Sequence, residues 1–250
     1  MRKSRGIFEC GHYNEPTAIY ITSSSTLESM RTIALLVLAF CLAALMPAMG
    51  QDASHWLAQA GRDYNNGSYS LALKDLDEYL ALNSSDSNAW VSRARLQVIL
   101  KSYNDAVESY DVALKIDGTD AKAWNDRGVV LSEALNDYDE ALASINRSLE
   151  INPLAAATWY NQGMVLDNMG RHNDALAALN QSIDLDSKMA QAWNLKGQVL
   201  MKMDNNKEAL KSFKKAVSID PSNKEYQDNK SKAQKAAGQP IEKKLDFPSE

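Results

Sequence analysis

Two consecutive segments of 34 residues decide the fold of this chain: residues 156–189 read AATWYNQGMVLDNMGRHNDALAALNQSIDLDSKM, and residues 190–223 read AQAWNLKGQVLMKMDNNKEALKSFKKAVSIDPSN. Each segment has a tryptophan at its fourth position, and small and large apolar residues recur at matching places behind it. The same phase continues toward the N-terminus, where further tryptophans follow at spacings of 34, 34, 35 and 34 residues. The five are Trp56, Trp90, Trp124, Trp159 and Trp193. A fixed period of this length indicates a repeat architecture.

Each repeat contains two apolar stripes at helical spacing, separated by a short turn rich in Gly, Asn and Asp. A small residue lies four places after each tryptophan: Ala60, Ala94, Gly128, Gly163 and Gly197. A large residue lies near the end of each second stripe: Leu76, Tyr110, Ile145, Leu179 and Phe213. Since small residues let two helices approach closely, each repeat is predicted to form an antiparallel helix hairpin. One hairpin cannot bury its apolar face alone, so the hairpins are expected to stack.

This pattern resembles the tetratricopeptide repeat family over roughly residues 53–223. The residues that fall on family positions include Trp56, Gly128, Ala141, Phe213, Ala216 and Pro221. The resemblance implies an all-α fold, a right-handed α-solenoid of five hairpins with a capping helix at its C-terminal end. The repeats are expected at residues 53–86, 87–120, 121–155, 156–189 and 190–223, the capping helix at 224–238 and a disordered tail at 239–250.

The sequence departs from the family pattern in two places. The Leu expected three residues after each tryptophan is replaced by a polar residue: Gln59, Arg93, Arg127, Gln162 and Lys196. The aliphatic stems of such side chains can still cover apolar surface, but this layer is expected to be looser than usual. The third repeat carries one extra residue around Ala134–Tyr138, which we place in its turn.

Composition excludes several classes of protein. With 45% hydrophobic and 24% charged residues, the chain is able to fold as a soluble protein. A net charge of −5 argues against a nucleic-acid partner, since such binders neutralise phosphates with basic side chains. The only cysteines, Cys10 and Cys41, lie near the N-terminus, so the remaining chain has no disulfide, cysteine-ligated zinc or cysteine nucleophile.

The segment 33–50 carries no charge, and its strongly apolar part of 14 residues, 33–46, is shorter than the roughly 20 that span a bilayer. Because Arg31 precedes it and small residues follow, residues 30–50 are predicted to be a signal peptide cleaved after Gly50. Residues 1–29 are then a mis-assigned extension, with translation beginning at Met30. The alternative is an uncleaved signal anchor. Both alternatives place the rest of the chain outside the cytoplasmic membrane.

A lipoprotein anchor at Cys41 is disfavoured, because Phe40 stands where a small residue is needed and the cysteine lies inside the apolar stretch. If the leader is cleaved, no part of the mature chain is expected to hold it at a membrane.

The search for catalytic chemistry finds none. The histidines His12, His55 and His172 are far apart in sequence, and no metal, phosphate-loop or nucleophile-elbow motif occurs. We therefore expect no enzymatic activity, no cofactor and no metal.

In the resembled family, the first helix of each hairpin lines the concave face and contacts peptide segments. The matching positions here are Leu57, Tyr64, Val91, Arg95, Val98, Lys122, Asn125, Val129, Tyr160, Met164, Asn194, Gln198 and Met201. Some of these are alternatively expected to pack between adjacent helices. The chaperone-binding members of the family bind two carboxylates with a set of five residues, the two-carboxylate clamp. Of this set the sequence has only the central Asn, at Asn161, so a C-terminal acidic peptide is not the expected ligand.

Charge is unevenly distributed: residues 51–155 sum to about −8, whereas residues 190–223 sum to about +3. The basic cluster is either a solvated helix face or a surface for weak self-association or for docking to an acidic partner. N-glycosylation sequons occur at Asn66, Asn83, Asn146, Asn180 and Asn229. Asn66 and Asn83 lie in predicted turns and are the better candidates for modification.

These observations predict an exported, non-enzymatic scaffold that binds a protein or peptide on its concave face. One alternative is an accessory subunit of an envelope assembly or secretion complex. Two less favoured alternatives are a remnant of a larger glycosyltransferase with a repeat region and a cytoplasmic co-chaperone. The predicted leader and the absence of the two-carboxylate clamp both argue against a cytoplasmic co-chaperone.

Overall fold

The computed structural model describes residues 52–238. Every helix of the described residues lies between Ala53 and Ala236. Among these helices, none combines the length and apolar composition that crossing a membrane requires. The predictions for residues 1–29, 30–50 and 239–250 concern segments outside the described residues.

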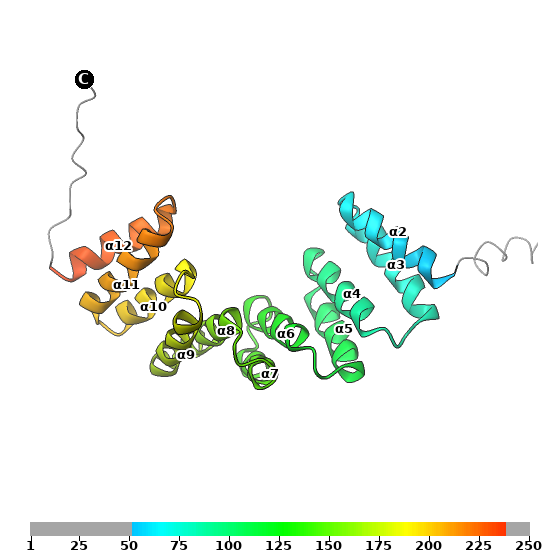
Figure 1. The fold of residues 1–250 in the computed structure, drawn as a ribbon, viewed down its shortest axis with the longest axis horizontal. Coiled ribbons are helices and arrows are strands. Elements are labelled where there is room, and N and C mark those ends of the chain that lie inside the picture. Colours follow the sequence, from blue (N-terminus) through cyan, green and yellow to red (C-terminus); the bar gives the residue numbers. More distant parts are fainter. Residues whose placement is uncertain (1–51, 239–250) are drawn as a thin grey trace, which may run out of the picture. The chain divides into compact units, whose positions relative to one another are not determined.

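Within residues 52–238 the regular structure consists of eleven α-helices, and no strand occurs there. Ten of the helices form five consecutive hairpins, which Figure 1 shows in chain order. The pairs are α2 (Ala53–Asn65) with α3 (Tyr69–Leu82), α4 (Ser87–Ile99) with α5 (Tyr103–Ile116), α6 (Ala121–Glu133) with α7 (Tyr138–Ile151), α8 (Ala156–Asn168) with α9 (His172–Leu185), and α10 (Ala190–Lys202) with α11 (Asn206–Ile219). A last helix, α12 (Lys224–Ala236), packs against α11. The predicted all-α repeat solenoid is confirmed.

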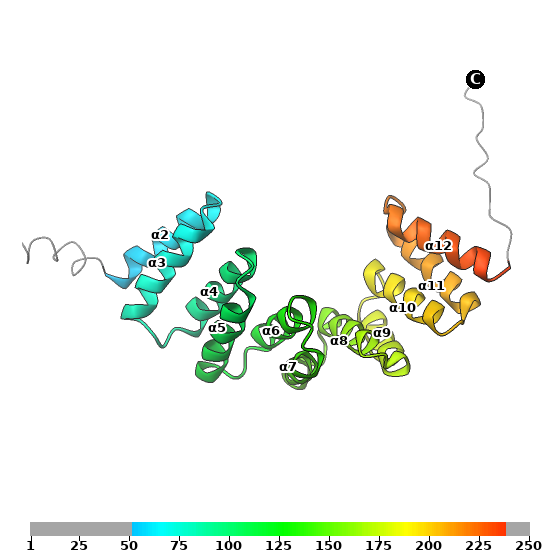
Figure 2. The same ribbon diagram turned by 180° about the vertical axis from the view of Figure 1, so that it is seen from behind.

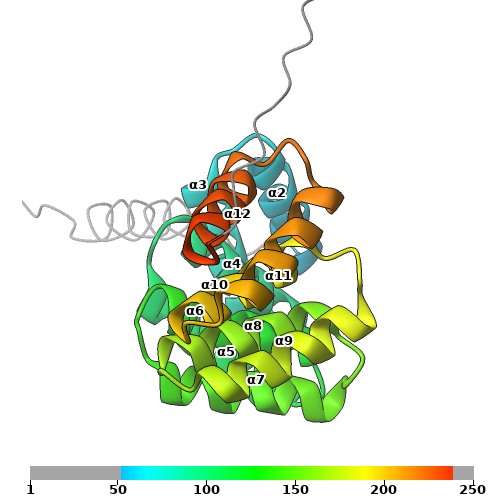
Figure 3. The same cartoon turned by 90° about the vertical axis from the view of Figure 1, so that its left-hand side faces the viewer.

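Adjacent hairpins pack through the second helix of one and the first helix of the next, an order that Figure 2 shows from behind. The first helices also approach one another: α8 contacts both α6 and α10, and α10 contacts α12. In Figure 3, α6, α8 and α10 lie on one side and α5, α7 and α9 on the other. We call the side formed by α2, α4, α6, α8, α10 and α12 the inner side, and the side formed by the second helices the outer side.

The tryptophans fix the turn that joins each repeat to the one before it. In four repeats the indole Nε1 donates a hydrogen bond to the carbonyl oxygen six residues earlier. The pairs are Trp90 with Ser84 (2.9 Å), Trp124 with Gly118 (3.1 Å), Trp159 with Pro153 (2.8 Å) and Trp193 with Ser187 (3.0 Å). In α12 the side chain of Gln227 bonds to Pro221 O in the same way, so the capping helix keeps the phase of the repeats.

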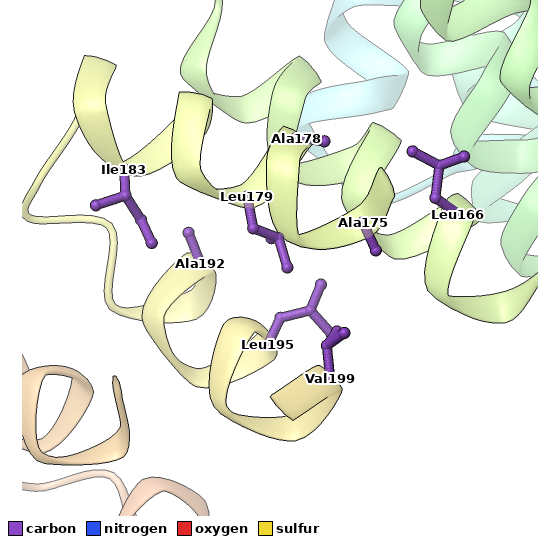
Figure 4. Packing of buried hydrophobic residues seen from close by; sticks show 8 residues of the cluster. All are labelled: Leu166, Ala175, Ala178, Leu179, Ile183, Ala192, Leu195 and Val199. Carbon is purple, nitrogen blue, oxygen red and sulfur yellow. The ribbon is translucent and has the colours of Figure 1, made fainter. Parts of the chain in front are cut away.

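The small residue on each first helix allows the second helix to approach closely. A Cβ atom built on Gly163 would lie 2.7 Å from Leu179 Cγ, which is closer than two carbon atoms can pack. Around this contact, the core of the fourth and fifth repeats gathers side chains from α8, α9 and α10 (Figure 4). The predicted pairing of small and large residues therefore builds the interior of the hairpin.

The extra residue of the third repeat lies in its turn. Residues 134–137 separate α6 from α7, one residue more than the turns 66–68 and 169–171. Asn136 in this turn adopts a left-handed backbone with φ of 56°, as Gly67 and Gly170 do at the equivalent positions. The insertion therefore lengthens the turn and leaves both helices intact.

Candidate functional site

The predicted contact residues all lie on first helices, and they differ in exposure. Leu57 and Tyr64 on α2 keep 44% and 49% of their surface exposed. Lys122 on α6 is also exposed. Two predictions are wrong: Val91 and Asn194 are only 4% and 6% exposed, so neither is available to a partner. Val91 points into the apolar core between the second and third repeats.

On the inner side, a pocket of about 360 Å³ lies between α2 and α4. Leu57 and Tyr64 line its α2 wall, and Arg95 lines its α4 wall. Leu76 and Leu96 supply further apolar surface. The pocket thus brings together three of the predicted contact residues and combines apolar side chains with one cationic group.

Arg95 is held in place from the next repeat. Its Nη2 and Nε atoms lie 2.9 and 3.2 Å from Asp126 Oδ2 on α6. The guanidinium is still partly exposed, so this ion pair orients the group without covering it. A partner carbonyl or carboxylate at the pocket edge could therefore accept hydrogen bonds from the remaining N–H groups.

Further along the inner side, predicted contact residues join the repeats to one another. Asn161 Nδ2 donates to Asn125 Oδ1 (2.8 Å), and Asn229 Nδ2 donates to Asn194 Oδ1 (3.1 Å) two repeats later. Asn194 and Gln198 also donate to Glu225 Oε1 on α12. These amide groups are occupied within the stack, which explains why Asn194 is buried.

The remaining predicted residues are partly buried. Val98 packs against the core of the second and third repeats, whereas Tyr160 and Met164 pack against that of the fourth and fifth. Met201 packs beside α11, and Val129 is partly exposed on α6. Of the thirteen predicted residues, Leu57, Tyr64 and Arg95 therefore lie together in the pocket. Most of the others pack within the stack of repeats.

Sequence reasoning missed a row of polar bonds that joins each first helix to the second helix before it. The residue three places after the tryptophan bonds to the residue sixteen places earlier. The pairs are Arg93 with Asp77 (2.7 Å), Arg127 with Asp111 (2.7 Å), Gln162 with Asn146 (2.7 Å) and Lys196 with Asn180 (2.6 Å). We call these four bonds the outer ladder. The polar residues three places after the tryptophans, which we expected to pack loosely, instead make specific hydrogen bonds and ion pairs in repeats two to five.

The described histidines have structural neighbours. His172 Nδ1 lies 2.9 Å from Asp167 Oδ1, and Lys202 Nζ lies 2.7 Å from Asp167 Oδ2. His55 packs edge-on against Trp56. Within residues 52–238, no group of three or more histidine, cysteine or acidic side chains is placed to hold a metal ion.

The sequon asparagines occupy two environments. Asn66 is exposed in the first turn, and Asn83 is exposed at the end of α3, where its Nδ2 donates to Tyr79 Oη (3.0 Å). Asn146 and Asn180 are both acceptors in the outer ladder. The preference for Asn66 and Asn83 as glycosylation sites stays a prediction.

Comparison with known proteins gives a consistent assignment of the repeats. Family models described as tetratricopeptide repeat match residues 57–121, 121–153, 156–189 and 190–223. Among curated proteins, no sequence matches this one.

Several solved structures share the fold. PilW, described as a widely conserved type IV pilus biogenesis factor, has a TM-score of 0.66 and 23% identity, covering 74% of this chain and 86% of that one. MamA from Desulfovibrio magneticus RS-1 has a TM-score of 0.65 and 23% identity, covering 70% and 99%. YrrB, described as having an unusual peptide-binding site, has a TM-score of 0.61 and 24% identity, covering 72% and 92%. At these identities the likeness shows the fold alone.

Proposed function

The chain belongs to the tetratricopeptide repeat family, and from this premise we propose that it is a non-enzymatic scaffold that binds a peptide segment of another protein on its inner side. The structural neighbour YrrB, described as having a peptide-binding site, supports this mode of binding.

The observation that carries the proposal is the pocket between α2 and α4. Leu57 and Tyr64 leave almost half of their surfaces in water, which is unfavourable for apolar and aromatic side chains that cluster at a concave surface. An apolar side chain of a partner would remove this surface from water. Arg95 at the opposite wall would bind a backbone carbonyl or a carboxylate of the same segment.

The test is selection of ligands from a displayed library of random peptides, followed by affinity measurement with variants. We expect the double variant Leu57→Ala/Tyr64→Ala to weaken binding of the selected peptides by roughly tenfold or more, as loss of buried anchors does. The control is Leu71→Ala, which removes an exposed leucine from α3 outside the pocket. Selected peptides that bind the double variant as tightly as the wild type would overturn the proposed site.

The location of the protein is a second part of the proposal. The predicted leader at residues 30–50 supports action outside the cytoplasmic membrane. Mass spectrometry of the purified protein tests this: a chain that begins at Gln51 supports export with cleavage, and a chain that retains Arg31 contradicts cleavage.

The alternative function is an accessory subunit of an envelope assembly or secretion complex. The predicted leader favours it, and so does the likeness to a pilus biogenesis factor. It differs from the first proposal in requiring one dedicated partner in the envelope. Selection of many unrelated peptides with equal affinity would count against this alternative.

A further inference from the structure

The fifth repeat carries a second concave surface, which the proposed function does not use. It lies between α9 and α11, with α10 forming its base, and has a volume of about 810 Å³. Leu176, Trp193 and Leu200 supply an apolar base. We call it the fifth-repeat groove. Because α9 and α11 are second helices, it opens away from the inner side.

The walls of this groove are strongly basic. Lys196, Lys211, Lys214 and Lys215 line it, and Glu208 is the single acidic residue among its lining residues. Glu208 is already paired, with its Oε1 2.6 Å from Lys211 Nζ. Among the described residues, no carboxylate forms an ion pair with the other three lysines. The groove therefore has an excess of positive charge beside an apolar base.

Lys196 occupies the most constrained position. Its ammonium donates a hydrogen bond to Asn180 Oδ1 (2.6 Å) and lies 5.3 Å from the centroid of the Trp193 ring. Burial lowers the pKa of Lys196 below its ordinary value. A carboxylate bound beside it would offset this effect, because an opposite charge favours the ammonium form.

The preceding repeat contains the same groove without the excess of positive charge. A concave surface of about 700 Å³ lies between α7 and α9, over α8, and Trp159 and Leu166 take the places of Trp193 and Leu200. Where the fifth repeat has Lys196, Lys211 and Lys215, this surface has Gln162, Ala177 and Gln181. The charged residues that line this surface, Arg171 and Asp174, pair with each other (2.6 Å). The preceding repeat therefore forms the groove without these lysines, so the fold does not require them.

We propose that the fifth-repeat groove binds an acidic segment of a partner protein, in which carboxylates flank one bulky apolar side chain. The apolar side chain would cover the partly exposed Leu176 and Trp193, and the carboxylates would pair with Lys196, Lys214 and Lys215.

A short segment fits the charge distribution better than an extended polyanion does. The chain has a net charge of −5, and residues 51–155 are strongly acidic. This part of the chain would repel a nucleic acid or an anionic membrane that extends past the groove. A short peptide contacts only the basic end.

The experiment measures fluorescence anisotropy of a labelled peptide, Glu-Asp-Glu-Leu-Asp-Glu-Asp, with the full chain. The test variant, Lys196→Gln/Lys214→Asn/Lys215→Gln, gives the three lysines of the proposed contact the residues found at the matching positions of the preceding repeat. The control variant, Lys207→Gln/Lys224→Gln/Lys232→Gln, removes the same charge from positions that do not line the groove. Thermal unfolding of both variants checks that they fold.

We expect the wild type to bind the acidic peptide, and binding to weaken between about 50 and about 300 mM NaCl as screening increases. The test variant should lose affinity by roughly tenfold or more, equivalent to about 1.4 kcal/mol, and the control variant by less than about twofold. A peptide with Gln and Asn in place of the acids should not bind.

Three results would overturn the proposal: no binding at low salt, equal loss in the two lysine variants, or binding to phosphatidylglycerol vesicles without binding to the peptide. The variant Leu57→Ala/Tyr64→Ala should leave binding of the acidic peptide unchanged. This last measurement separates failure of the groove from failure of the inner-side pocket.

Discussion

At the scale of the residue, each hairpin depends on one small and one large side chain that face each other. Ala60 and Ala94 serve as the small residue in the first two repeats, and glycine serves in the other three. The three glycines leave no room for a side chain. A Cβ on Gly197 would lie 2.6 Å from Phe213 Cε1, and Phe213 is almost completely buried. The large residue alone does not decide between alanine and glycine, since leucine faces alanine in the first repeat (Leu76) and glycine in the fourth (Leu179).

The first prediction tests this contact with Gly197→Ala. Since the Phe213 ring cannot move without disturbing the core, we expect the free energy of unfolding to fall by about 1–2 kcal/mol, measured by chemical denaturation. The control is Gly61→Ala on α2, where no atom lies within 4 Å of the added Cβ. There the higher helix propensity of alanine should raise stability by about 0.5–1 kcal/mol. Equal effects of the two substitutions would contradict the steric explanation.

A second residue-scale prediction concerns Asp75 on α3, which is only 8% exposed and whose Oδ2 has no hydrogen-bond partner. Burial and the neighbouring carboxyl group of Asp63 raise the pKa of Asp75 above its ordinary value of 3.8. The folded state therefore binds this proton more tightly than the unfolded state, and stability is lost as pH rises above 3.8 through the raised pKa.

We expect Asp75→Asn to raise the melting temperature at neutral pH, because an amide keeps the shape of the side chain without the buried charge. Its melting temperature should also depend less on pH between about pH 4 and pH 7 than that of the wild type. The measurement is thermal unfolding followed by circular dichroism. A lower melting temperature of the variant at neutral pH would show that the ionised carboxylate is stabilising.

At the scale of the element, the outer ladder attaches each hairpin to the one before it, and its rungs differ in strength. Arg127 on α6 bonds to Asp111 on α5 and to both Glu140 and Ser144 on α7. Gln162 makes a single neutral bond to Asn146. Removing a charged group that satisfies several partners costs more than removing one neutral partner.

The third prediction therefore compares Arg127→Leu with Gln162→Leu, each of which restores the residue that the family pattern has at this position. We expect Arg127→Leu to lower the free energy of unfolding by about 1 kcal/mol, because Asp111 and Glu140, both partly exposed, lose their counter-charge. Gln162→Leu should change it by less than about 0.5 kcal/mol. Denaturant titration of both variants measures the free energy of unfolding. An unchanged value for Arg127→Leu would show that the outer ladder contributes little to stability.

The hairpins could be predicted from sequence because their signals are local. Trp159, Gly163 and Leu179 have fixed spacings within one repeat, and helix packing dictates those spacings. Contacts between repeats depend on side-chain direction, which spacing does not determine. Spacing therefore places Val91 and Asn194 on the contact face, although both are buried. The outer ladder did leave a signal, since an acidic or amide residue lies sixteen places before each polar residue of repeats two to five.

At the scale of the whole repeat unit, stability is transmitted between neighbours, so the last repeat needs a partner on its exposed side. Helix α12 supplies it. Tyr226 is buried against Ala190 and Ala216, and Ala233 is buried beside Phe213. Glu225 accepts hydrogen bonds from two residues of α10. The sequence of α12 is mostly polar, but it has a few apolar residues at the positions that contact α10 and α11.

The fourth prediction removes this helix by ending the chain after Asn223. The apolar surfaces of α10 and α11 that Tyr226 and Ala233 cover would then face water. We expect the melting temperature to fall by roughly 5–10 °C, and the shortened protein to associate in a concentration-dependent way. The control ends the chain after Gly238, which keeps α12 and should retain the melting temperature and the monomer-to-oligomer ratio of the full chain. If the two truncations behave alike in calorimetry and sedimentation, α12 does not act as the cap, and the fifth hairpin is stable through its contacts with the fourth.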